Sequence, residues 1–180
     1  MVDFSGISAQ QTKVLLYRTQ PQTNDILDFI FNFHGKQVDY FVEGENFTPE
    51  ADFVLLKTDN EDFASQFSPT IGFIGNDEKP ENPNAILSSI TGGGIVVYPE
   101  FYADWDRAIL QTTNFFRKIP YSAARTTSSK EKVILDTEFG EVEFPISDAK
   151  VQKEILGLMH FCQHMGIMED DFYEALTAYF

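Results

Sequence analysis

Residues 13–24 read KVLLYRTQPQTN, and this stretch decides the predicted fold. Its apolar run, 13–17, is short and ends in turn-like residues, as expected of a buried strand that leaves its sheet. Thr23 or Asn24 can cap the helix that follows, and Gly35 permits a left-handed stop at its end. A strand followed at once by a helix is the first unit of an α/β domain.

The rest of the chain repeats this alternation. Short apolar runs predict strands at 38–42, 53–56, 71–74 and 95–98, and a hairpin at 132–136 and 141–146. Helices are predicted between 57 and 70 and at 85–90, 102–116, 148–165 and 170–179. The pattern therefore predicts one α/β domain over residues 1–180, with a mainly parallel sheet, helices on both faces and a small antiparallel hairpin.

The chain is strongly acidic. It carries 28 Asp and Glu residues against 13 Lys and Arg, which gives a formal net charge of -15. Such a charge repels a phosphate backbone, so we expect no nucleic-acid partner. Basic residues gather between Arg107 and Lys132, whereas 39–81 is acidic, which predicts two solvated faces of different charge.

Cysteine content and hydropathy bear on the compartment. Cys162, the one cysteine, cannot form an intramolecular disulfide and fits a reducing environment. No run approaches the roughly 18 to 20 apolar residues that span a bilayer, and the first residues lack the pattern of a secretory signal. We therefore expect a cytoplasmic protein that does not enter membranes.

The turn after the first strand is where a doubly wound domain normally binds phosphate, because backbone N–H groups and a helix N-terminus converge there. Arg18 and Pro21 stand where a phosphate-binding loop has glycines, and Gln22 stands where it has lysine. Thr19 and Thr23 remain as hydroxyl donors. Arg18, Thr19, Gln22 and Thr23 are therefore candidates for a modest anion site, with an ordinary solvated turn as the alternative.

The chain resembles the central, ATP-binding domain of the Mur ligases, the muramyl-peptide ligases of cell-wall synthesis, whose pattern at this turn is GTxGKTT. Residues 51–63 (ADFVLLKTDNEDF) resemble the family's strand that ends in a metal-binding glutamate, and 68–76 (SPTIGFIGN) resemble its next strand. Residues 144–180 keep the family's order of short strand, long helix, Gly-Ile turn and a last helix, here ending in LTAYF. The resemblance implies this P-loop-like fold for residues 1–180.

Carried over position by position, the resemblance implies that the catalytic groups are lost. The magnesium-binding glutamate falls on Lys57, which puts a cation where a carboxylate should hold the metal. The family's Asp-His pair falls at about 80–81, and its His-Asn pair at about 149–150, where other residues stand. Lys57 and Asn76 remain as polar residues of the former site.

Other patterns have simpler explanations. His160 and His164 have a metal-binding spacing, yet the helical wheel places them opposite the apolar stripe that holds Cys162, so we interpret them as surface histidines. Residues 91–94 (TGGG) precede a strand instead of following one, which favours a turn over a phosphate loop. Most aromatic residues are expected in the core, but an exposed interaction patch is a second possibility for Phe101, Tyr102, Trp105, Tyr179 and Phe180.

Three hypotheses follow. The leading one is a non-catalytic binding or assembly module, without catalytic residues, metal or cofactor, that binds another protein chain or a small anionic ligand. The first alternative is a component of an ATP-dependent muramyl-peptide ligase, whose missing groups come from another chain and in which Arg18, Lys57 and Asn76 contact substrate. The second alternative is a sensor of muramyl peptide or another anion that uses Arg18 and the adjacent helix N-terminus.

Overall fold

The computed structural model describes residues 4–42, 47–76 and 78–180. Within these ranges the main sheet has six parallel strands in the order β2-β3-β1-β4-β5-β6. Their bounds are β1 (Thr12–Tyr17), β2 (Asp39–Tyr40), β3 (Phe53–Thr58), β4 (Ile71–Ile74), β5 (Ile95–Pro99) and β6 (Arg117–Tyr121). A smaller antiparallel sheet contains β7 (Arg125–Thr126), β8 (Val133–Thr137) and β9 (Gly140–Phe144).

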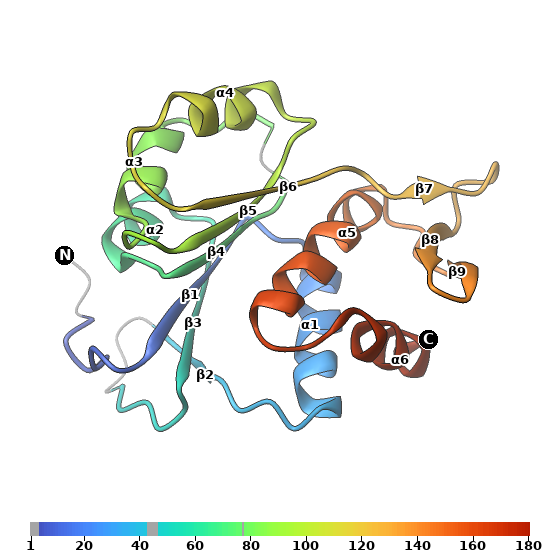
Figure 1. Cartoon of the computed structure of the whole chain (residues 1–180), viewed down its shortest axis with the longest axis horizontal. Helices are drawn as coiled ribbons and strands as arrows, with labels where there is room; N and C mark the ends of the chain where they lie inside the picture. The colour runs from blue at the N-terminus through green and yellow to red at the C-terminus, as the bar shows by residue number, and fades with distance from the viewer. Residues whose placement is uncertain (1–3, 43–46, 77) are drawn as a thin grey trace.

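Helices cover both faces of the main sheet. They are α1 (Pro21–Phe33), α2 (Glu61–Phe67), α3 (Pro83–Ser89), α4 (Ala103–Gln111), α5 (Ala149–His164) and α6 (Glu169–Tyr179). Figure 1 shows α1, α5 and α6 on one side of the sheet and α2, α3 and α4 on the other. None of the helices in the described ranges is both long and apolar enough to cross a membrane.

The central strand shows why the sheet needs two helical layers. Val14 and Leu16 enter the core under α1, α5 and α6, whereas Leu15 and Tyr17 enter the core under α2, α3 and α4. A parallel strand covered on both faces is apolar at successive positions, which accounts for the run at 13–17. The predicted fold class is therefore confirmed.

Close packing holds α5 against the sheet. A Cβ at Gly157 would lie 2.6 Å from the ring of Tyr121 and 2.8 Å from the ring of Phe73, so glycine sets the approach of the helix. The hydroxyl of Tyr121 donates to the carbonyl of Ile74 at 2.8 Å, which fixes the ring. Asp148 caps the start of α5 by accepting the N–H of Lys150 at 2.7 Å.

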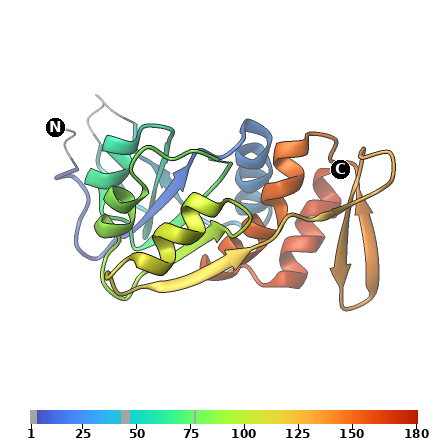
Figure 2. The same cartoon turned by 90° about the horizontal axis from the view of Figure 1, so that it is seen from above.

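The predicted hairpin is confirmed, and it lies beside α6 at one end of the molecule (Figure 2). The prediction of a helix to residue 116 is wrong, because α4 ends at Gln111 and β6 follows. The amide of Asn114 donates to the carbonyls of Leu87 and Ile90, both at 2.8 Å, and draws the chain away from the helix axis. Strand β6 was not predicted, because it lies at the edge of the sheet and its exposed Arg117 and Lys118 interrupt any apolar run.

Two other predicted boundaries change. The strand predicted at 38–42 is limited to Asp39–Tyr40. The helix predicted to start after Thr23 or Asn24 begins at Pro21, because proline is favoured in the first helical turn. Its N-cap residue, Gln20, makes no side-chain capping bond. The N–H of Gln20 instead donates to the carboxylate of Glu154, on α5, at 3.1 Å.

Candidate functional site

A cleft of about 630 Å³ opens at the carboxyl ends of β1, β3 and β4. Its lining residues are Arg18, Thr19, Gln20, Pro21, Asn24, Lys57, Thr58, Asp59 and Asn76. The chain leaves β1 toward α1 on one face of the sheet and leaves β4 toward α3 on the other face (Figure 1). Ligands of doubly wound domains bind where the crossovers diverge in this way, so the cleft is the candidate site.

The N-terminus of α1 holds a carboxylate that α5 supplies. Glu154 is fully buried. Its Oε2 accepts the N–H of Gln20 at 3.1 Å and the hydroxyl of Thr23, and its Oε1 accepts the N–H of Asn76 at 2.9 Å. A carboxylate is favoured at this end of a helix dipole. Two backbone N–H groups and one hydroxyl at the phosphate-binding turn and beside it therefore donate to Glu154.

Two opposing effects act on this carboxyl group. Burial raises the pKa of Glu154 above its usual value, because the charged form loses hydration. Hydrogen bonds from Thr23, Gln20 and Asn76 favour the charged form and reduce that rise. The three donors thus offset part of the cost of burying a charge.

Gly75 makes room for the carboxylate. A Cβ at this position would lie 2.6 Å from Oε1 of Glu154 and 2.5 Å from the carbonyl oxygen of Arg18. Neither Glu154 nor Gly75 was predicted from the sequence as part of the site. The available signal was the position of Glu154, three residues after Val151 on the apolar side of α5, because a charge there requires partners.

The structure brings two of the four predicted anion-binding residues to the cleft. Arg18 lines it with a left-handed backbone, φ 52°, and its guanidinium carbon lies 5.5 Å from the centre of the Tyr17 ring. Thr19 also lines it and donates its hydroxyl to Oδ1 of Asn24 at 2.7 Å. Thr23 is buried against Glu154, and Gln22 lies outside the described lining.

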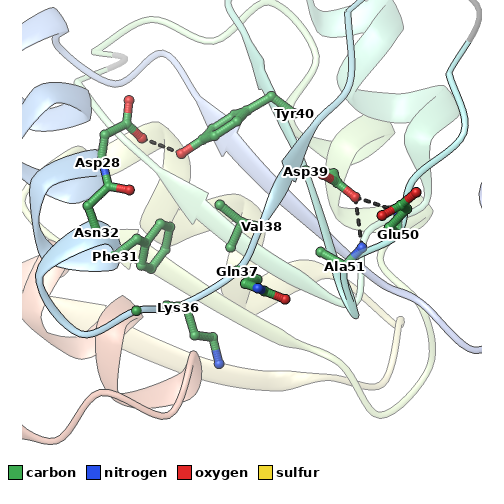
Figure 3. A pocket seen from close by; sticks show the side chains of 11 residues that line it. Asp28, Phe31, Asn32, Lys36, Gln37, Val38, Asp39, Tyr40, Glu50 and Ala51 are labelled. Carbon is green, nitrogen blue, oxygen red and sulfur yellow. Dashed lines mark hydrogen bonds between the residues drawn. The ribbon is translucent and has the colours of Figure 1, made fainter.

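Lys57 lies at the cleft but is neutralised by Asp28. Its Nζ donates to both carboxylate oxygens of Asp28, each at 2.9 Å, and lies 4.4 Å from the centre of the Tyr40 ring. The hydroxyl of Tyr40 donates to the same carboxylate, as Figure 3 shows. Burial, followed by this bond to Asp28, raises the pKa of Tyr40 far above its usual value. The cation at the predicted metal position is thus held by a carboxylate of α1.

Asn76 links three elements at the edge of the cleft. Its Nδ2 donates to the carbonyl of Lys150 at 2.8 Å, and its Oδ1 accepts the hydroxyl of Tyr102 at 2.8 Å. Both ends of the amide are therefore used to join the end of β4 to α5 and to the start of α4. Its position supports a structural role beside the cleft.

A second hollow, of about 640 Å³, lies between α1 and β2 (Figure 3). Asp39 lines it and accepts the N–H groups of Glu50 and Ala51 at 2.7 Å and 2.8 Å. Lys36 also lines it, and its Nζ lies 4.0 Å from the centre of the Phe53 ring. The charged groups of this hollow include both acids and a lysine, and they already contact other groups of the protein. The hollow therefore indicates no particular class of ligand.

The remaining predicted features lie away from the cleft. His160 and His164 are half-buried, and across the described residues no group of three His, Cys, Asp or Glu side chains could hold a metal ion. Residues 91–94 form the predicted turn, with the N–H of Gly94 bonded to the carbonyl of Thr91 at 2.8 Å. The turn predicted at 91–94 is therefore confirmed.

Core packing, the expectation for most aromatic residues, holds for Trp105 and Tyr102, two of the five residues considered for an exposed patch. Trp105 is fully buried under α4, with its ring centre 6.1 Å from that of Tyr17, and Tyr102 is also buried. Both face inward because α4 packs on the sheet. Tyr179 and Phe180 lie elsewhere, at the end of α6, where Phe180 is exposed.

The fold, a six-stranded parallel sheet flanked by helices with a small antiparallel sheet, matches that of domains in solved Mur ligases. The structure is similar to the UDP-N-acetylmuramoylalanyl-D-glutamyl-2,6-diaminopimelate--D-alanyl-D-alanyl ligase from Acinetobacter baumannii, with a TM-score of 0.65, 14% identity, and coverage of 93% of this chain and 46% of that chain. It is also similar to the UDP-N-acetylmuramate:L-alanyl-gamma-D-glutamyl-meso-diaminopimelate ligase from Neisseria meningitides, with a TM-score of 0.66, 10% identity, and coverage of 93% and 65%.

A murein peptide ligase from Psychrobacter arcticus gives a TM-score of 0.61 at 8% identity, over 94% of this chain and 47% of that chain. The chain thus spans about half the length of the first of these ligases and less than two thirds of the second. No protein-family model and no curated protein matches the sequence. At such low identities the likeness shows the fold alone.

Proposed function

We propose that this chain is a non-catalytic binding or assembly module built on the fold of a Mur ligase central domain. The observation that carries the proposal is the buried carboxylate of Glu154 at the N-terminus of α1. It already accepts the N–H groups of Gln20 and Asn76 and the hydroxyl of Thr23. A phosphate at this turn would need the same donors.

Electrostatics supports the proposal. Two unit negative charges 4 Å apart repel by about 4 kcal/mol at the effective dielectric constant of a protein surface. A helix N-terminus attracts an anion by about 0.3–1 kcal/mol, and by about 2 kcal/mol when partly buried. A charged Glu154 carboxylate would therefore oppose a phosphate bound at the turn.

The groups around the cleft support it as well. Phosphoryl transfer depends on holding the triphosphate in line and on neutralising its charge with a metal and with cations. Lys57 lies at the position that the resemblance assigns to a magnesium ligand, and its charge is neutralised by Asp28. The Arg18 to Asn24 turn lacks the glycines that let backbone approach a phosphate.

Calorimetric titration of the purified chain with magnesium and ATP tests the proposal, together with a phosphate-release assay on the same samples. We expect no saturable binding below millimolar concentration and no phosphate release above the buffer control. Micromolar affinity accompanied by hydrolysis would show that the turn still serves a nucleotide, and the proposal would be wrong.

A second function, a sensor of a small anion, is supported by one observation. The cleft beside Glu154 is open, and Arg18 and Thr19 line it. A carboxylate-bearing ligand such as a muramyl peptide could meet the guanidinium without entering the turn. A thermal-shift panel of cell-wall precursors and simple carboxylates tests this function, since a ligand at 100 times its dissociation constant stabilises the folded state by about 2.7 kcal/mol.

A further inference from the structure

A mostly apolar hollow of about 370 Å³ lies at the carboxyl ends of β2 and β3 and beside the first turn of α2. Tyr40, Phe41 and Val42 line it from the β2 side of the chain, and Leu56 and Phe63 line it from β3 and α2. We call this site the apolar hollow. Pockets for small molecules measure about 300–1,000 Å³ and are lined mainly by apolar side chains. The apolar hollow therefore has the size and lining of a site for one small apolar group.

The core of the protein holds the walls of the apolar hollow in place. Phe41 and Leu56 are buried in the core under α2, α3 and α4, and Phe63 packs against the same core. The ring centres of Phe41 and Phe47 lie 5.3 Å apart. A pocket whose walls are already ordered loses little side-chain entropy when a ligand enters. The apolar hollow is therefore preformed.

The apolar hollow adjoins the cleft at the ends of β1, β3 and β4, because Lys57 and Thr58 line both. The Nζ of Lys57 is held by both carboxylate oxygens of Asp28, each at 2.9 Å, so the lysine side chain is fixed at its tip as well as at the backbone. The charge of Lys57 is neutralised by this pair, and its methylene groups can contact an apolar ligand. One ligand can thus extend from the cleft into the apolar hollow.

The cleft supplies the polar end of such a site. Arg18 and Thr19 line it, and so does Asp59, which is exposed to solvent. The guanidinium carbon of Arg18 lies 5.5 Å from the centre of the ring of Tyr17, a fully buried residue. A guanidinium binds a carboxylate through two parallel hydrogen bonds. A carboxylate that meets Arg18 therefore leaves the rest of its molecule in the cleft, beside the apolar hollow.

We infer that the cleft and the apolar hollow together bind one small amphiphilic carboxylate. Its carboxylate meets Arg18, and its aliphatic or aromatic tail lies against Val42, Leu56 and Phe63. This inference rests on the second function proposed above, the sensor of a small anion, and names the class of ligand. Anions without a tail leave the apolar hollow empty and should bind more weakly.

Acetate, butanoate and hexanoate test the inference, because they share a head group and differ only in the length of the tail. Each fully buried methylene strengthens binding about fourfold. We expect the wild type to bind hexanoate at least about tenfold more tightly than acetate, with butanoate between them. Two-dimensional ¹H–¹⁵N NMR titrations measure the affinities. Both acetate and hexanoate should shift the amide signals of Arg18 and Thr19, whereas only hexanoate should shift those of Val42 and Phe63.

Three variants separate the tail from the head group. Val42 is 47% exposed, so Val42→Asp puts a carboxylate at the apolar hollow with little change to the core, and the preference for hexanoate over acetate should fall to about one. Leu110→Asp is the control, because Leu110 is 71% exposed and lines neither site, and it should keep the preference. Arg18→Asn, at a left-handed position that asparagine tolerates, should weaken acetate and hexanoate by the same factor.

Equal affinity of the wild type for acetate and hexanoate would overturn the inference and leave the anion sensor standing. No binding of either carboxylate would overturn both. Hexan-1-ol or hexylammonium bound as tightly as hexanoate would show that the site does not select a carboxylate, and the inference would again be wrong. So would a preference for hexanoate that Val42→Asp leaves unchanged. None of these outcomes bears on magnesium and ATP binding, so the leading proposal is tested separately.

Discussion

The hydroxyl of Thr23 and the carboxylate of Glu154 meet inside the protein although 131 residues separate them along the chain. Thr23 belongs to the first turn of α1, and Glu154 belongs to α5. Together with Gln20 and Asn76, this contact ties both helices to the end of β4. In a doubly wound domain the N-terminus of this helix commonly faces a ligand. Here the N-terminus of α1 is hydrogen-bonded to Glu154 of α5.

Removal of this carboxylate should cost stability. In Glu154→Ala, three donors lose their acceptor, and each unsatisfied buried donor costs about 1–3 kcal/mol before water enters. Since water reaches a newly opened space, we expect the free energy of unfolding to fall by about 2–4 kcal/mol in total. Urea unfolding followed by circular dichroism measures it. The control is Glu174→Ala, where an exposed carboxylate should matter by less than about 0.5 kcal/mol. Equal losses in the two variants would contradict the account.

The same variant should gain an anion site. Without the carboxylate, the N–H groups of Gln20 and Asn76 and the helix dipole face an empty space. We expect sulfate and pyrophosphate to raise the melting temperature of Glu154→Ala more than that of the wild type. Sodium chloride at matched ionic strength is the control for general salt effects. Identical shifts in both proteins would show that Glu154 does not occupy an anion position.

The raised pKa of Glu154 predicts a pH dependence of known sign. Below the usual carboxyl pKa near 4.5 the group is protonated in both folded and unfolded chains, and burial has no ionisation cost. At higher pH the carboxyl group loses its proton in the unfolded chain first, because its pKa is lower there than in the folded protein. The free energy of unfolding therefore falls as pH rises toward the folded-state pKa. The wild type should therefore lose stability relative to Glu154→Gln between about pH 4 and neutrality. Urea midpoints across that range measure the difference, and a difference that grows in the wild type's favour would refute the assignment.

Packing at Gly157 should outweigh helix propensity. Alanine is about 1 kcal/mol better than glycine inside a helix, but overpacking a core costs about 1–3 kcal/mol. A methyl group at Gly157 would lie 2.6 Å from the ring of Tyr121, whose hydroxyl is bonded to Ile74. We expect Gly157→Ala to destabilise the protein by about 1–2 kcal/mol. Gly92→Ala, where nothing lies within 4 Å of the added Cβ, is the control and should be nearly neutral.

The thiol of Cys162 should be inert in the folded protein. It is fully buried in α5, and burial raises its pKa far above the usual value. Only the thiolate reacts readily, so labelling should require unfolding. We expect Ellman's reagent to titrate one thiol per chain in urea and almost none in native buffer. Rapid labelling in native buffer would mean that α5 opens easily.

The fold could be predicted where the pattern of residues is set by the core. The run at 71–74 became β4 and the apolar stripe of 148–165 became α5, because both bury their apolar side chains. Strand β6 could not be predicted in this way. Its exposed Arg117 and Lys118 and its single neighbour, β5, leave no apolar run to recognise.

The candidate site could be predicted only in part. The family resemblance led to one alternative in which Arg18, Lys57 and Asn76 contact a substrate together, and all three line one cleft. The pairing of Lys57 with Asp28 and the use of Thr23 by Glu154 depend on tertiary packing. Neither contact leaves a local pattern in the sequence.

The most direct measurement is a crystal structure of the chain soaked with magnesium and a nonhydrolysable ATP analogue. The account predicts that density for the Glu154 carboxylate remains within hydrogen-bonding distance of Gln20, Thr23 and Asn76, with no phosphate at the turn. Density for phosphates bound to the backbone of residues 18–24, with Glu154 displaced and a metal ion alongside, would contradict it.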